Sequence, residues 1–216
     1  MPVNVQLGRF EMAYGTERFI GAVGWHYIGR TFDGARFTFD FGDMLKLDVF
    51  STVERGDVPY KGNSGRTPAM IATDKGLHGL WAMFKLNKEH KADVFFYMES
   101  DPARANRYDI FELSRSTFGF THWGTYGDLS SIIEFGYQMG EIPNRSFPDS
   151  ARSIAAMTVS AQVHYKISDD TKVGLGFDML SGQDPEKTAD GDDYTIYSPN
   201  FGTNHKFYGH MDYFTA

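Results

Sequence analysis

The sequence contains no cysteine, which excludes disulfide bonds, thiolate zinc sites and a thiol nucleophile. It also lacks a basic excess, because 21 Lys and Arg stand against 28 Asp and Glu and give a formal net charge of −7. Nucleic-acid binders need a basic face for phosphate contacts, so this class is not expected. No apolar run approaches the roughly 18 residues of a membrane-spanning helix. With 216 residues and a mean hydropathy of −0.39, these absences alone are typical of one mildly acidic soluble domain.

Aromatic residues and glycine are plentiful instead, with 19 Phe, 12 Tyr, 3 Trp and 23 Gly against 8 Pro. Apolar and polar residues alternate with the period of two that β-strands show. Met157 and Val159, for example, are separated by Thr158 and followed by Ser160. We predict ten strands, at 3–14, 32–41, 44–53, 77–86, 91–99, 110–122, 129–139, 153–167, 171–180 and 205–214. Most have the length of about 9–12 residues that crosses a bilayer at a tilt.

The predicted connections alternate between short and long. Short turns fall at 42–43, 87–90, 124–128 and 168–170, and long loops fall at 15–31, 54–76, 100–109, 140–152 and 181–204. Outer-membrane barrels show this rhythm, with short periplasmic turns and longer extracellular loops. Trp81, Tyr97, Tyr126 and Tyr165 lie near strand ends, where interface girdles are found. The sequence therefore predicts an all-β protein, a transmembrane antiparallel up-and-down β-barrel. A soluble β-sandwich or lipocalin-like barrel is the alternative, because alternation does not tell which way the apolar face points.

If the apolar faces contact lipid, the alternate side chains line a polar lumen. An Arg or Lys that faced lipid at mid-membrane would cost about 2–4 kcal/mol, which favours the lumen for the charged residues. We select as lumen residues Arg9, Arg36, Lys46, Glu134, Gln138, Lys166, Lys206 and Asp212. The two signs are nearly balanced among the charged lumen positions. A network of ion pairs that stiffens the wall is therefore an alternative to a ring that attracts anions.

Other chemistry finds little support in the sequence. Ser160 and His164 lie about 13 Å apart on an extended strand, too far for a nucleophile and its base, so we expect no enzyme and no cofactor. The acidic loop with Asp190, Asp192 and Asp193 is a weak candidate for calcium, but it lacks the EF-hand spacing, and a solvated loop is the favoured interpretation. No other metal site is expected.

Several motifs, in order along the chain, resemble the alginate export family of outer-membrane barrels. They are Gly8-Arg9-Phe10-Glu11, Tyr14 to Gly21, Gly29 to Arg36, Thr117 to Phe120, Glu134 to Gly140, Ser181-Gly182-Gln183 and Phe201 to Asp212. The chain departs from the family pattern at three positions. Phe10 replaces a usual Gln, Thr121 replaces an Arg, and Gln183 replaces an Asp.

The resemblance implies a channel of the bacterial outer membrane that passes an anionic uronic-acid polymer, guided by Arg9, Arg18, Arg30 and Arg36. A general porin for small solutes is the alternative. The implied partners are outer-membrane lipid, the polysaccharide or solute, and periplasmic export proteins, with no nucleic acid. Family members resemble barrels of about eighteen strands. Residues 1–216 are thus expected to form one domain that is part of a larger barrel, in agreement with an N-terminus that shows no signal-peptide pattern.

Overall fold

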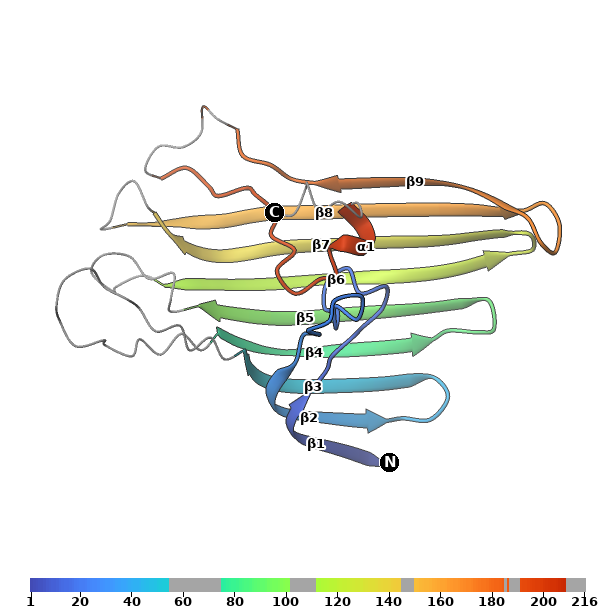
Figure 1. Ribbon diagram of the computed structural model, residues 1–216, viewed down its shortest axis with the longest axis horizontal. Coiled ribbons are helices and arrows are strands. Elements are labelled where there is room, and N and C mark those ends of the chain that lie inside the picture. Colours follow the sequence, from blue (N-terminus) through green and yellow to red (C-terminus); the bar gives the residue numbers. More distant parts are fainter. Residues whose placement is uncertain (55–74, 102–111, 145–149, 185, 187–190, 209–216) are drawn as a thin grey trace.

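The computed structural model describes residues 1–54, 75–101, 112–144, 150–184, 186 and 191–208. They form one antiparallel sheet in which every strand pairs with the next strand of the chain (Figure 1). The strands are β1 (Val3–Phe10), β2 (Phe32–Asp40), β3 (Leu45–Glu54), β4 (Lys75–Lys85), β5 (His90–Asp101), β6 (Leu113–Tyr126), β7 (Leu129–Pro143), β8 (Ala151–Lys166) and β9 (Lys172–Leu180). The predicted all-β, antiparallel, up-and-down order is confirmed. β1 and β9 are the edges of the sheet, and none of the described strands pairs with the free side of either.

The strand connections have the predicted rhythm. β2–β3, β4–β5, β6–β7 and β8–β9 are joined through 41–44, 86–89, 127–128 and 167–171, and these short turns gather at one end of the sheet (Figure 1). The four connections at the other end are longer, and the first of them covers residues 11–31.

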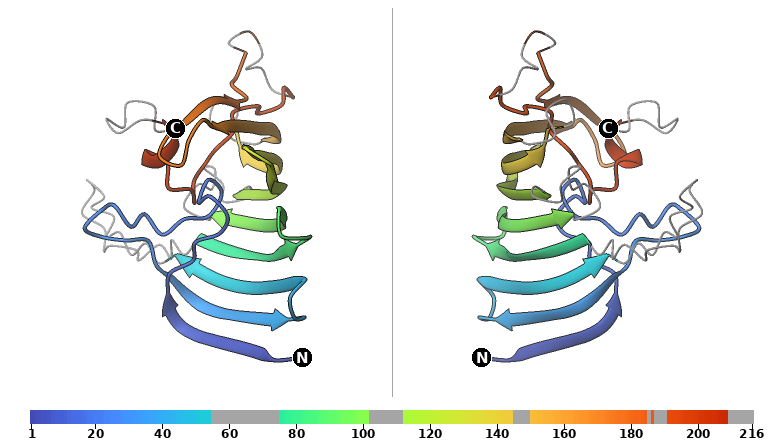
Figure 2. Two further views of the ribbon diagram at one scale, coloured as in Figure 1. Left: turned by 90° about the vertical axis from the view of Figure 1, so that its right-hand side faces the viewer. Right: turned by 90° about the vertical axis from the view of Figure 1, so that its left-hand side faces the viewer.

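The outer face of the sheet is apolar and exposed. We define it as the strand positions whose side chains point to the same side as those of Phe37, Val49, Leu80, Phe96 and Leu175. The exposed fractions of these five side chains lie between 37% and 84%. Tyr126 and Tyr165 also point outward, next to the short turns. Alternation places the remaining side chains on the inner face, which is the concave side of the curved sheet (Figure 2).

The inner face is covered by the chain itself. Residues 11–31 and 194–208, which we call the inner layer, lie against it (Figure 2). The aromatic core forms between this layer and the strands. It comprises Phe10, Met12, Tyr14, Phe19, Ile20, Phe32, Phe50, Leu77, Trp81, Phe95, Tyr97, Leu113, Ile154, Ala156, Tyr197 and Phe201. Trp81 and Tyr97 were assigned to an interface girdle, and this prediction is wrong, because both side chains are buried in the core.

Two predicted strands differ in the structure. The first was expected to reach residue 14, but β1 ends at Phe10, because the chain leaves the sheet to place Met12 and Tyr14 in the core. The strand expected at 205–214 is instead a short helix, α1 (His205–Tyr208), over its described part, and the remainder lies outside the described residues. No helix in the described ranges is long and apolar enough to cross a membrane.

Candidate functional site

Arg18 is the centre of the most densely connected polar cluster on the inner face. Its Nε lies 2.8 Å from Glu134 Oε2 of β7, and its Nη2 lies 2.9 Å from Ser160 Oγ of β8 and 2.9 Å from Asp178 Oδ1 of β9. The Phe207 ring covers the guanidinium with its centroid 4.2 Å away, a cation–π distance. One residue of the inner layer therefore connects three adjacent strands.

The electrostatics of Arg18 follow from this burial. Its side chain and that of Glu134 are 1% and 0% exposed. Burial lowers the pKa of Arg18, but the hydrogen bond to Glu134 and the charge of Asp178 raise it, and the net pKa lies above the ordinary value. The guanidinium stays charged, and removing it would leave Glu134 buried without a counter-ion.

Glycines allow the inner layer to approach the sheet closely. Gly119 and Gly136 are opposite each other on β6 and β7. A Cβ on Gly136 would lie 2.5 Å from Phe19 Cε1, so only glycine leaves room for the Phe19 ring at this point. Phe19 also contacts Phe95, with ring centroids 4.4 Å apart. This contact sets the position of the segment that carries Arg18.

Tyr14 attaches the same segment to β3 and β4. Its ring stacks on Trp81 at 4.7 Å, and its hydroxyl donates a 2.8 Å hydrogen bond to Asp48 Oδ2. Burial raises the pKa of Tyr14, and the Asp48 carboxylate raises it further, so the phenol remains a donor. The segment between Tyr14 and Arg18 thus crosses the inner face from β3 to β9.

Gln138 positions the second part of the inner layer. Its amide exchanges two 2.9 Å hydrogen bonds with the backbone of Ser198. Nearby, Asn200 donates to Glu99 at 2.8 Å, and Glu99 forms a buried 3.1 Å ion pair with Arg115. These polar side chains of the sheet therefore bind residues of the segment 194–208, and they are buried rather than exposed to water.

The other arginines selected from the sequence have different surroundings. Arg30 donates to the carbonyl oxygens of Gly21, Asn200, Phe201 and Gly202. Arg36 lies on the inner face, where it donates to Gln6 at 2.6 Å and lies 3.9 Å from Asp48.

Arg9 does not lie on the inner face, and its assignment to the lumen is wrong. It is opposite Asp33 in the register, two positions from the outward Leu7, and by alternation it points outward. Its guanidinium is 66% exposed and pairs with Asp33 at 2.7 Å. The alternation in this short strand was assigned to the wrong face because Phe10, not Arg9, continues the buried positions.

The remaining predicted lumen residues lie at the margins of the inner face. Lys46 is half exposed and 3.3 Å from Asp40, and Lys166 is 2.6 Å from Asp169. Lys206, in α1, donates to the carbonyl oxygen of Thr16 at 3.1 Å. Asp212 lies outside the described residues. The structure therefore places Arg18, Glu134 and Gln138 between the inner layer and the sheet and leaves the lysines at the edges of the layer.

The weak calcium candidate gains no support. Asp190 lies outside the described residues. The carbonyl oxygens of Asp192 and Asp193 accept hydrogen bonds from Arg152. Within the described ranges, no three His, Asp or Glu side chains are grouped closely enough to hold a metal ion.

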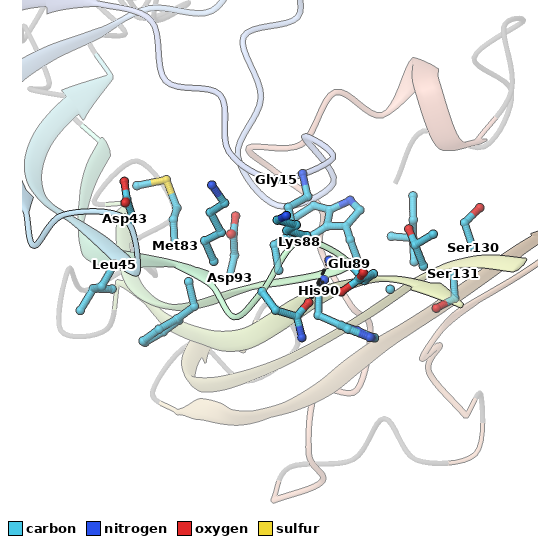
Figure 3. Close-up of a pocket in the computed structure, with 18 of the residues that line it drawn as sticks. Gly15, Asp43, Leu45, Met83, Lys88, Glu89, His90, Asp93, Ser130 and Ser131 are labelled. Atoms are coloured by element: carbon cyan, nitrogen blue, oxygen red, sulfur yellow. Dashed lines mark hydrogen bonds between the residues drawn. The ribbon is translucent and has the colours of Figure 1, made fainter. Parts of the chain in front are cut away.

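A cavity of about 850 Å³ opens at the short-turn end of the inner face (Figure 3). Gly15 of the inner layer and Asp93 lie in its lining (Figure 3). Lys85, Lys88 and Lys91 also line it, and none of the three forms an ion pair with a described residue. Lys91 lies 4.2 Å from the centroid of a Trp123 ring. Selection by motif missed Lys88 and Lys91, although the three lysines within residues 85–91 and the short turn are visible in the sequence, where they were not connected to a site.

In comparisons with known proteins, the sequence matches no family model and has no significant match to a curated protein.

Proposed function

We propose that the chain forms part of the wall of an outer-membrane β-barrel channel whose polar interior passes an anionic polymer or a small anionic solute. The sheet supplies the wall, the outer face contacts lipid, and the inner face with its cavity borders the conduit. The ordered motifs that resemble the alginate export family support an exopolysaccharide as the substrate.

The observation that carries the proposal is the absence of charge from the middle of the outer face. Along β1–β9, the outward charged residues in the described part of the chain are Arg9, Asp33 and Glu141, all at the ends of strands that lead into long loops. The central rows consist mainly of Val, Leu, Ile, Phe, Met and Ala, together with Tyr137, and the rows beside them include the uncharged polar side chains of Ser51, His78 and His122. An exposed apolar sheet of this extent is costly in water and favourable against acyl chains.

The location of the covering layer argues against a soluble β-sandwich. A sandwich buries its apolar face under the second layer and leaves the polar face to water. Here the inner layer covers the buried Glu134, Gln138 and Arg115 along with the aromatic core, while the apolar outer face has no cover among the described residues: Leu175 and Phe177 are 84% and 59% exposed. This is the arrangement expected when the solvent outside the sheet is lipid.

The cavity lysines favour an anionic solute. Lys85, Lys88 and Lys91 form no ion pair with a described residue, and the three positive charges at the short-turn mouth can attract an anion. A general porin is the second candidate, because deeper cations are already neutralised: Arg18 is paired with Glu134 and Asp178.

Single-cysteine labelling tests the membrane assignment cleanly, because the chain has no cysteine of its own. Phe96→Cys and Leu175→Cys report on the outer face, and Lys46→Cys is the matched inner-face control. After reconstitution into vesicles and labelling with an environment-sensitive dye, we expect nitroxide lipids to quench the two outer labels and iodide to quench the inner one. Equal iodide quenching at all three positions, together with a monodisperse monomer in buffer without detergent, would refute the proposal.

Reversal potentials in a salt gradient test the substrate class. We expect anion preference in the parent protein, its loss in the triple variant K85Q/K88Q/K91Q, and its retention in the charge-preserving K85R/K88R/K91R. A pore with no anion preference and no block by oligouronates would instead support the general porin.

A further inference from the structure

Residues 22–30 form a closed loop within the inner layer, which we call the aromatic loop. Its two ends are joined by a 2.8 Å hydrogen bond from Arg30 N to Ala22 O, and the Arg30 side chain binds carbonyl oxygens of the segment 194–208. Val23 has a φ of 55°, in the left-handed region that β-branched residues rarely adopt. A compact loop with closed ends that retains backbone strain is typical of a functional surface.

The aromatic loop presents large side chains to its surroundings instead of burying them. Trp25, Tyr27 and Ile28 are 50%, 89% and 65% exposed, and none of them belongs to the aromatic core. Their rings form a row with two imidazoles. Trp25 stacks on His205 of α1 with centroids 4.0 Å apart, and His26 lies 5.4 Å from Trp25 and 4.3 Å from Tyr27. The inner layer that carries this row lies on the concave side of the sheet (Figure 2).

A hollow of about 400 Å³ adjoins the aromatic loop at the ends of β1 and β2. Gly29 of the loop lines it together with Arg9 and Asp33, whose side chains form an ion pair at 2.7 Å. Arg30 also lines it, and Glu11 Oε1 lies 3.3 Å from the position that a Cβ on Gly29 would take. Two cationic and two anionic side chains thus lie around the hollow, which offers donors and acceptors without an excess of either sign.

We propose that the aromatic loop and the hollow beside it bind a pyranose ring of a soluble oligosaccharide. The faces of a pyranose ring carry C–H groups, which pack on the electron-rich face of an aromatic ring, and its hydroxyls lie around the rim. Trp25 and Tyr27 provide the aromatic faces, while Arg9 and Asp33 provide a donor and an acceptor for hydroxyls. A few polar groups beside aromatic side chains are the usual composition of a small-molecule site.

This inference deepens the proposed function and rests on it for the arrival of a saccharide at this side of the sheet. It assigns the recognition at the aromatic loop to the sugar ring rather than to its carboxylate, because the charges around the hollow are balanced. A protein surface packed on the same rings would have to bury the Arg9–Asp33 pair, which is costly, whereas a saccharide supplies hydroxyls to it. Neutral and anionic saccharides should therefore bind here with similar affinity.

Cysteine labelling tests the site without removing a ring. A Cβ on Gly24, next to Trp25, would have no atom within 4 Å, and Gly182 is a matched control in equally open space. The chain has no other cysteine. In micelles, we expect saturating cellotetraose to slow the reaction of Gly24→Cys with a hydrophilic maleimide about fivefold or more, because a bound ligand covers its site, and to leave Gly182→Cys unaffected. A tetrauronate should protect equally, and sorbitol, which has hydroxyls but no ring, should not protect.

Truncation of Tyr27 tests the role of the aromatic rings. We expect Tyr27→Ala, combined with Gly24→Cys, to raise the cellotetraose concentration needed for half protection about tenfold, which corresponds to about 1.4 kcal/mol. Tyr27→Phe retains the ring and should retain the protection. Tyr126→Ala, which removes an exposed ring from the outer face, should leave the protection unchanged. Equal protection in Tyr27→Ala and Tyr27→Phe would contradict recognition by stacking.

The outcomes separate the saccharide site from the channel function. Labelling of Gly24→Cys that is much slower than that of Gly182→Cys without sugar would show that another part of the protein or a second copy covers the loop, and would overturn the site. Protection by sorbitol, or by the tetrauronate alone, would also overturn it. No protection, in a protein whose Phe96→Cys label is quenched by nitroxide lipids, overturns the saccharide site and leaves the channel standing. Protection in a protein whose Phe96→Cys label is quenched by iodide overturns the channel and supports the site.

Discussion

The two faces of the same nine strands have opposite surroundings. On the outer face, large apolar side chains such as Leu175 are exposed to 84%, whereas on the inner face Glu134 and Gln138 are 0% and 1% exposed. The same alternating pattern of residues produces both faces, but the segments that cover the inner face, 11–31 and 194–208, lie outside the strands. The inner layer buries an aromatic core and a polar network against the inner face, and the outer face has no cover among the described residues.

The largest expected effect on stability comes from removing the counter-ion of a buried charge on the inner face. Arg18→Met leaves Glu134 buried without its counter-ion, and we expect the free energy of unfolding to fall by about 3–5 kcal/mol. Urea titration of the protein in micelles, read from heat-modifiable gel migration, measures it. Adding Glu134→Gln should recover part of the loss, because it removes the orphaned charge. A loss below about 1 kcal/mol would contradict the buried-network assignment.

A charge placed on the outer face should have the next largest effect. Phe96→Arg would put a guanidinium in the middle of the apolar rows, where contact with acyl chains costs about 2–4 kcal/mol. Folding yield and urea midpoint in vesicles measure it, with Phe96→Met as the size-matched control. A tolerated arginine at this position would indicate that water, not lipid, contacts the outer face.

Filling the space between the sheet and the inner layer should lower the free energy of unfolding by a smaller amount. Gly136→Ala forces a methyl group against the Phe19 ring, and we expect a loss of about 1–3 kcal/mol from overpacking. Gly176→Ala on β9 is the matched control, because its Cβ would have an ordinary 3.8 Å contact with Gln162. The same urea titration compares them, and equal effects would show that Phe19 moves aside without cost.

The smallest effect should come from the exposed arginine. Arg9 forms its ion pair with Asp33 at 66% exposure, and such pairs contribute about 0–1 kcal/mol. Arg9→Gln should therefore leave the urea midpoint nearly unchanged. A loss comparable to that of Arg18→Met would mean that Arg9 is buried in the folded protein.

The strands could be predicted because their signal is local. Residues 153–167 were expected to form a strand and β8 covers Ala151–Lys166, since Met157, Val159 and their polar neighbours carry the pattern themselves. Short turns were equally visible, because only a few residues separate adjacent alternating runs. The free lysines of the cavity needed the fold, which brings Lys85 and Lys91 to one rim.

The inner layer could not be predicted in this way. Arg18 was selected, but its partner Glu134 is 116 positions away, and no periodicity links a loop residue to a strand at that separation. Phe10, Met12 and Tyr14 alternate with Glu11 and Ala13 as strand residues do, so the sequence pattern extended the strand where the chain in fact turns inward. Trp81 was assigned to the wrong environment for a similar reason, because an aromatic residue near a strand end is compatible both with an interface girdle and with a buried core.

The meander of nine strands has one further geometric consequence. Eight reversals of direction separate β1 from β9, so the two free edges of the sheet run the same way. A cylinder closed by antiparallel pairing throughout then requires an odd number of additional strands between those edges. A second copy of this sheet, inserted in the same orientation, would meet the first with parallel strands at both seams. For a cylinder closed in this way, the complementary strands would therefore differ from a copy of this sheet in the same orientation.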